Sequence, residues 1–235
     1  DLFDYTKSEH HSEYIFDIEY QSGIGEGSTF TTAFFPNFSE MNEFFNITGA
    51  GQEYNNPTQE LISLFVPGDT RKEVTVGVPG GFYDADSVFH ALPTSTNQTY
   101  TKKYFDSSPV RADSKANWKV IRYADVLLMY AEALNENGKP QQAIPFLNQV
   151  RTRAGLEGYP NTMSQTETRD AIVLERRLEL SFEGVRWFDL VRTGKAYEVM
   201  KDKGMAPYMT VFPIPLSQVQ IINDPTIFPQ NPGYD

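Results

Sequence analysis

Apolar residues recur at helical spacing over 118–135, and this run constrains the fold more than any other feature of the sequence. An apolar stripe along one face is the pattern of an amphipathic helix. Gly138 can end that helix and Pro140 can begin another, so a second helix is predicted over 140–154. Two helices joined by so short a connection are expected to form an antiparallel hairpin. The first stripe consists of Ile121, Ala124, Leu128 and Ala131.

The predicted hairpin is similar in its residue order to one tetratricopeptide repeat. The positions that carry this likeness are Tyr130, Gly138, Ala143 and Leu147. Pro145 fits less well, because it removes a backbone donor inside the second helix. A single repeat cannot bury its own apolar face, and the sequence holds no second copy, so the hairpin is expected to pack against other parts of the protein.

A third helix is predicted over 166–183, where Ser164 and Glu167 have the spacing of a capping box and Gly184 can supply a left-handed stop. A short helix is predicted next, at 186–191. Prolines interrupt the rest of the chain, so an extended C-terminal tail is expected.

Residues 1–116 differ from the helical region 117–235, because they are rich in Gly, Pro, Ser, Thr, Asn and aromatic residues. This composition predicts loops with a few short strands and helices. Alternating side chains predict a strand at 14–20, and an apolar face that begins at Pro57 predicts a short helix to Phe65. The sequence therefore predicts a mainly α fold, in which a helical hairpin packs against a loop-rich half.

Composition excludes several kinds of site. The 235 residues include no cysteine, which rules out disulfides, thiolate metal sites and a cysteine nucleophile. A net charge of −11 repels a phosphate backbone, so no nucleic-acid partner is expected. His10 and His11 are adjacent and point in different directions, and His90 is isolated. Neither a metal site nor a serine triad is therefore predicted, and no cofactor is expected.

Five segments, in the same order along the chain, resemble the SusD/RagB family of outer-membrane nutrient-binding lipoproteins. The most specific is ERRLELSFEGVRWFDLVR at 175–192. The others are WKVIRYADVLLMYAEA at 118–133, LNQVRTRAG at 147–155, FPIP at 212–215 and QNPGY at 230–234. The resemblance is clear from about residue 113 onward and weaker before it.

This resemblance implies a SusD-like fold and a function in nutrient capture. Such a protein sits on the cell-surface face of a bacterial outer membrane, held by a lipid anchor. It binds an oligosaccharide and delivers it to a SusC-like TonB-dependent transporter. The RagB branch implies the same architecture with a peptide ligand. Family members are usually twice as long, so the anchor and part of the binding surface are expected before Asp1.

A charged cluster in the most specific segment invites an enzymatic interpretation, with two carboxylates acting on a glycosidic bond. The residue spacing favours a structural ion-pair network instead, with pairs such as Arg176–Glu179 and Glu179–Arg186 joining the third helix to the next. Since nothing pairs two particular carboxylates in a cleft, no catalytic residue is predicted, and a glycoside hydrolase is the weakest hypothesis. The predicted network comprises Glu175, Arg176, Glu179, Glu183, Arg186, Asp189 and Arg192.

The candidate ligand residues lie in the loop-rich half, where aromatic rings stand beside amides or carboxylates. Sugar faces stack on aromatic rings and sugar hydroxyls bond to Asn and Asp, although the same set also suits a peptide. The segment 78–84 is expected to be a turn that presents its rings outward. The two tryptophans, Trp118 and Trp187, are assigned to packing. The predicted ligand residues are Phe82, Tyr83, Asp84, Tyr54 and Asn55.

Overall fold

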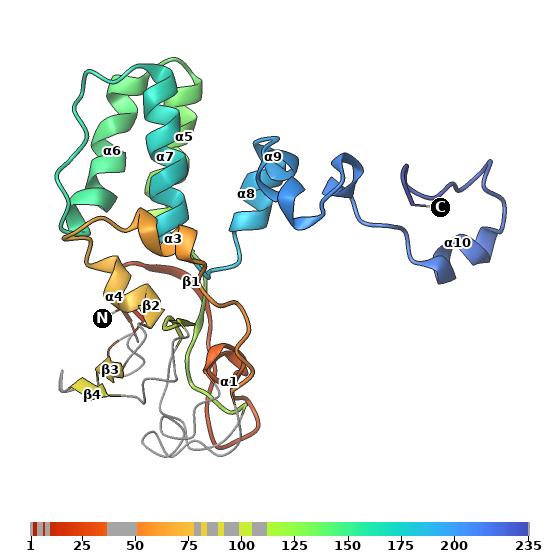
Figure 1. The fold of residues 1–235 in the computed structure, drawn as a ribbon, viewed down its shortest axis with the longest axis horizontal. Helices are drawn as coiled ribbons and strands as arrows, with labels where there is room; N and C mark the ends of the chain where they lie inside the picture. Colours follow the sequence, from red (N-terminus) through yellow and green to blue (C-terminus); the bar gives the residue numbers. More distant parts are fainter. Residues whose placement is uncertain are drawn as a thin grey trace. The chain divides into compact units, whose positions relative to one another are not determined.

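The structure is a computed structural model of the whole chain, and it divides into two compact units, Asp1–Glu183 and Gly184–Asp235. Figure 1 draws both units. The residues that the structure describes are 2–3, 7, 10–36, 51–77, 81–83, 89–91, 99–104 and 112–234.

Three helices pack together in the first unit, and Figure 1 shows them side by side. They are α5 (Tyr123–Glu136), α6 (Pro140–Arg153) and α7 (Gln165–Glu179). The first two form the predicted hairpin, and Ala171 and Ile172 of α7 complete its core. The third helix thus covers the apolar face that one repeat leaves open. The mainly α fold class predicted from the sequence is confirmed.

The ends of these helices follow local rules. Gly138 has a φ of 73°, which lets the chain turn between α5 and α6, and Pro140 is the first residue of α6. At α7 the capping box is confirmed, since the Ser164 side chain accepts from the Glu167 amide and Glu167 bonds back to Ser164. Pro145 is tolerated because its position on α6 is exposed.

The predicted helix over 118–135 is wrong in its first five residues, which form β6 (Trp118–Arg122). This strand pairs antiparallel with β1 (Tyr14–Ile18), as expected for the strand predicted near residue 14. The β-branched Val120 and Ile121 suit a strand. Helical periodicity alone missed the pairing, because its partner lies about a hundred residues earlier in the sequence.

The third helix also ends before its predicted limit, at Glu179. Phe182 adopts a left-handed φ of 66°, and Gly184 follows at 81°, so the helix cannot continue through this segment. Gly184 adopts the left-handed conformation predicted for it, but α7 has already ended at Glu179, and Phe182 is left-handed before Gly184 is reached.

The other described parts of the first unit contain short elements, as predicted. Their helices are α1 (Phe30–Phe34), α3 (Gln59–Leu64) and α4 (Arg71–Thr75). Their strands form two antiparallel pairs, β2 (Val76–Gly77) with β5 (Tyr100–Thr101) and β3 (Gly81–Tyr83) with β4 (Phe89–Ala91). The helix α3 confirms the short helix expected at 57–65, and its Leu61 packs with Val76 and with Leu178 of α7.

The second unit holds short helices and a folded-back terminus. The predicted helix at 186–191 is confirmed as α8 (Arg186–Arg192), followed by α9 (Ala196–Met200), η1 (Lys201–Lys203) and η2 (Pro207–Thr210).

The C-terminal tail is not extended throughout, which corrects the prediction. Leu216–Ile222 form α10, which begins after Pro215 and ends where Asn223 turns left-handed. Beyond it the amide side chain of Gln230 bonds to both the N–H and the carbonyl of Ile214. Among all described residues, no helix has the length and apolar character needed to cross a membrane.

Candidate ligand-binding surface

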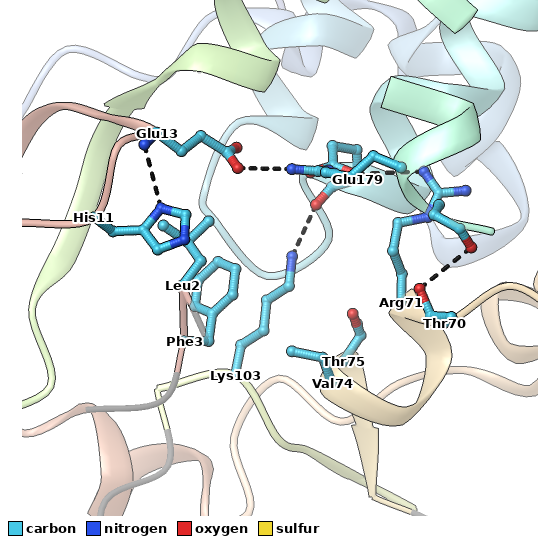
Figure 2. A pocket seen from close by; sticks show the side chains of 12 residues that line it. Leu2, Phe3, His11, Glu13, Thr70, Arg71, Val74, Thr75, Lys103 and Glu179 are labelled. Atoms are coloured by element: carbon cyan, nitrogen blue, oxygen red, sulfur yellow. Dashed lines mark hydrogen bonds and ion pairs between the residues drawn. The ribbon is translucent and has the colours of Figure 1, made fainter. Parts of the chain in front are cut away.

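A cavity of about 290 Å³ opens in the first unit beside α4. Figure 2 shows Lys103 extending toward Glu179, with Phe3 on one side and Val74 and Thr75 on the other. The Lys103 ammonium lies 4.7 Å from the centre of the Phe3 ring and donates to the backbone carbonyl of Glu179 at 2.8 Å. The floor of this cavity is therefore charged and its wall is apolar.

The charged residues of this floor belong to a larger ion-pair network centred on Arg122, whose side chain is buried and does not line the cavity. Its guanidinium holds Glu183 with two bonds, of 2.7 and 2.8 Å, and reaches Glu179 and Glu13 at 2.6 Å each. Arg153 bonds to the same Glu13 and Glu179 carboxylates. Two-bonded arginine–carboxylate contacts fix both orientation and distance, so β6 is locked to the C-terminal end of α7.

A second arginine extends the network toward α4. Arg71 bonds to both oxygens of Asp69, at 2.7 and 2.8 Å, and to Glu175 at 2.6 Å. It also lies 3.4 Å from Glu179, which links the two arginine centres. The network as a whole holds the five carboxylates of Glu13, Asp69, Glu175, Glu179 and Glu183 against the five cations of Arg71, Lys103, Arg122, Arg151 and Arg153.

The pKa shifts follow from burial competing with charge. Burial raises the pKa of Glu179, but Arg122, Arg153 and Lys103 outweigh it and hold that pKa well below its usual value. Glu183 behaves in the same way, since Lys103 and Arg122 lower its pKa against burial. For Glu175 burial prevails over its arginine partners, and the pKa is raised. Glu179 and Glu183 therefore stay ionised at neutral pH.

The structure brings three of the predicted cluster residues, Glu175, Glu179 and Glu183, into this network. Arg176 instead reaches Asp125 on α5, at 2.8 Å. In the second unit, Asp189 and Arg192 pair with each other at 2.8 Å along α8, which also begins with Arg186. The expected Glu179–Arg186 pair stays a prediction, because the two residues belong to separate units.

Sequence reasoning missed the five cations that pair with these carboxylates, namely Arg71, Lys103, Arg122, Arg151 and Arg153. A signal for three of them was available, since Arg122, Arg151 and Arg153 lie inside the family-like segments 118–133 and 147–155. Among the described residues, no group of three acidic or histidine side chains is arranged to hold a metal ion. The network has its charges paired, which suits a structural role better than proton transfer.

A group of aromatic rings lies beside β6. Trp118 stacks on Tyr104 with ring centres 4.9 Å apart, and Phe30 of α1 lies 4.8 Å from Trp118. Tyr20 packs edge-on against Phe30 at 5.5 Å. Trp118 is only partly buried, yet its ring faces are taken by other rings, which agrees with its assignment to packing.

The predicted ligand residues fall in two places. Tyr54 and Asn55 form an exposed turn between α1 and α3. Phe82 and Tyr83 lie in β3, so the backbone expected to be a turn is a strand there, paired with β4. Asp84 lies outside the described residues.

Comparison with known proteins gives a consistent result. A sequence profile of the SusD family matches residues 90–234. SusD-like protein P38 of Formosa agariphila is 36% identical over 156 residues, which are 63% of this chain and 28% of that protein. A solved laminarin-binding SusD-like protein is 30% identical with a TM-score of 0.72, over 98% of this chain and 52% of the other.

A second solved structure, surface glycan-binding protein A from Bacteroides thetaiotaomicron in complex with laminarihexaose, is 26% identical with a TM-score of 0.72. The match covers 98% of this chain and 54% of that one. The chain thus spans about half the length of the solved proteins that it matches and a smaller share of the curated relative.

Proposed function

The chain belongs to the SusD family, and we propose that it is a non-enzymatic surface protein that captures an oligosaccharide. The observation that carries this proposal is the fold-wide likeness to two solved proteins whose names specify laminarin and laminarihexaose. Laminarin is therefore the first glycan to test. A general acid or base has to lie within hydrogen-bond reach of its substrate. The buried carboxylates of Glu179 and Glu183 are instead paired with Arg122, which supports binding without catalysis.

We place the ligand in the loop-rich part of the first unit. Phe82, Tyr83 and Asp84 stay proposed ligand residues there, together with Tyr54 and Asn55. The helical part is less suited to a ligand, because the inward faces of α5, α6 and α7 are already used for packing against each other.

Delivery is the second half of the proposal. We propose that the protein caps a SusC-like TonB-dependent transporter at the outer membrane and is held there by a lipid anchor. Affinity purification of the tagged full-length protein from outer membranes, followed by mass spectrometry, tests this step. A co-purifying TonB-dependent barrel supports delivery, and its absence under conditions where the glycan is the carbon source contradicts it.

The ligand class is tested by a glycan array beside a peptide library, with the same labelled protein on both. We expect saturable binding to glycans with repeating hexose rings and none to the peptides. Binding to peptides alone would replace the oligosaccharide with a peptide ligand and leave the architecture unchanged.

A further inference from the structure

We propose that the turn Glu53–Asn55 is a preformed stacking subsite, in which the Tyr54 ring takes the apolar face of a sugar ring. The side-chain amide of Asn55 then bonds to the hydroxyls at the edge of that sugar. This inference rests on the proposed glycan-binding function and assigns one position within it.

The Tyr54 ring is exposed in a region where other tyrosines are buried. It is 58% exposed, whereas Tyr100 and Tyr104 are 3% and 2% exposed. None of the described residues makes a hydrogen bond or a ring contact with its side chain. A tyrosine that pins a loop to the core is covered by that core, so the exposure of Tyr54 argues against a packing role.

The backbone under this ring is held firmly in place. The amides of Gln52, Glu53 and Tyr54 donate to the carbonyls of Thr32, Phe35 and Ala33, at 2.9, 3.2 and 2.8 Å. These bonds satisfy carbonyls that α1 leaves open at its C-terminal end. On the other side, the hydroxyl of Thr101 in β5 donates to the Asn55 carbonyl at 2.6 Å.

The approach to α1 is close enough to require a glycine. A Cβ on Gly51 would lie 2.1 Å from the carbonyl oxygen of Phe35, which no side chain can accept. The turn is therefore anchored at its start by a contact that only Gly51 allows, and the anchored segment carries the exposed Tyr54 ring.

Both neighbours of Tyr54 adopt left-handed backbone. Glu53 has a φ of 56° and Asn55 a φ of 60°. Asn tolerates this region, but Glu does not prefer it. The backbone on both sides of the exposed ring is therefore strained, and the surrounding hydrogen bonds hold it in this conformation. Backbone strain of this kind is common at ligand-binding positions.

This arrangement fits a sugar better than a charged or extended ligand. The C–H face of a pyranose covers a flat aromatic ring, and the neighbouring amide supplies both a donor and acceptors to the ring hydroxyls. Because the backbone is fixed before the ligand arrives, little ordering entropy opposes binding.

Calorimetric titration with laminarihexaose tests the subsite in four variants. Tyr54→Ala is expected to weaken binding by about 5- to 140-fold, the range found for single stacking contacts with flat ligands. Tyr54→Phe keeps the ring and should bind nearly as wild type. Asn55→Gly keeps the left-handed backbone but removes the amide, and should weaken binding less than Tyr54→Ala does. Tyr123→Ala, which removes a ring that is 50% exposed on α5, is the matched control and should bind as wild type.

All four variants are expected to melt within a few degrees of wild type, because each altered side chain is exposed. Wild-type binding that Tyr54→Ala leaves unchanged would overturn the subsite and leave the proposed function standing. A wild-type protein that binds no member of a hexasaccharide panel, laminarihexaose and maltohexaose included, would overturn the proposed function together with the subsite. Loss of affinity in Tyr123→Ala as well as in Tyr54→Ala would also contradict the assignment.

Discussion

At the scale of single residues, the buried charges hold the most testable energetics. Arg122 satisfies the carboxylates of Glu13, Glu179 and Glu183 at once. Removing one partner of a buried pair leaves charge uncompensated, so Arg122→Ala should destabilise the protein by about 3–5 kcal/mol. Urea denaturation measures this loss.

The exposed pair Arg169–Glu136 is the matched control for Arg122. Solvent screens an exposed ion pair, so Arg169→Ala should change the stability little. Equal losses from the two variants would show that burial is not what makes the Arg122 network matter.

The same carboxylates determine how the free energy of unfolding changes at acid pH. Because the folded-state pKa of Glu179 lies below its ordinary value of 4.5, folding favours the ionised form. Its stabilisation is complete above that value and is lost as the pH falls through 4.5 toward the folded-state pKa. Glu183 acts in the same direction, whereas Glu175, with a raised pKa, opposes it.

The free energy of unfolding is therefore expected to fall with acidification from about pH 5 downward, by the linkage of protonation to folding. Glu179→Gln should flatten this acid limb, since it removes the titrating group. An unchanged slope between pH 3 and 5, measured by urea titration, would contradict the role given to Glu179.

The ion pairs also show which contacts the sequence could predict and which it could not. Three of the five carboxylates of the network, Glu175, Glu179 and Glu183, were predictable, because they repeat at helical spacing on one segment. Their main partners were not, since Arg71 lies 104 residues from Glu175 and Arg122 lies 57 residues from Glu179. Helical spacing identifies neighbours on one helix and carries no information about pairs brought together by folding.

At the scale of elements, prediction succeeded where local signals act alone. The capping box at Ser164, the Gly138–Pro140 connection and the α6 helix all follow from nearby residues. It was wrong at 118–122, where pairing with β1 overrides the helical pattern, and at 216–222, where prolines suggested an extended chain.

The capping box gives a prediction at this scale. Ser164→Ala removes the hydroxyl that accepts a hydrogen bond from the Glu167 amide. The free energy of unfolding should therefore fall by about 1 kcal/mol. Thermal denaturation followed by circular dichroism measures this change. Thr166→Ala, at an exposed position in the same first turn, is the control and should be neutral or slightly stabilising. A larger loss at Thr166 than at Ser164 would be inconsistent with the cap.

At the scale of the whole molecule, the sequence predicted the fold class but did not identify the ligand. The apolar stripes of three helices determine the helical part, and three of the five family-like segments overlap these helices. The candidate site instead depends on the turn at Tyr54, which is held by hydrogen bonds to α1 and β5, and on β3, which pairs with β4. Tyr54 was proposed as a ligand residue from its neighbours in the sequence, and its ring is exposed.

The central claim is that this SusD-family chain binds an oligosaccharide without altering it. Calorimetric titration with laminarihexaose, followed by chromatography of the recovered sugar, tests the claim directly. We predict saturable binding to one class of site and recovery of the intact hexasaccharide after prolonged incubation. Shorter sugars in the recovered sample, lost on substitution of a single Asp or Glu, would contradict the account.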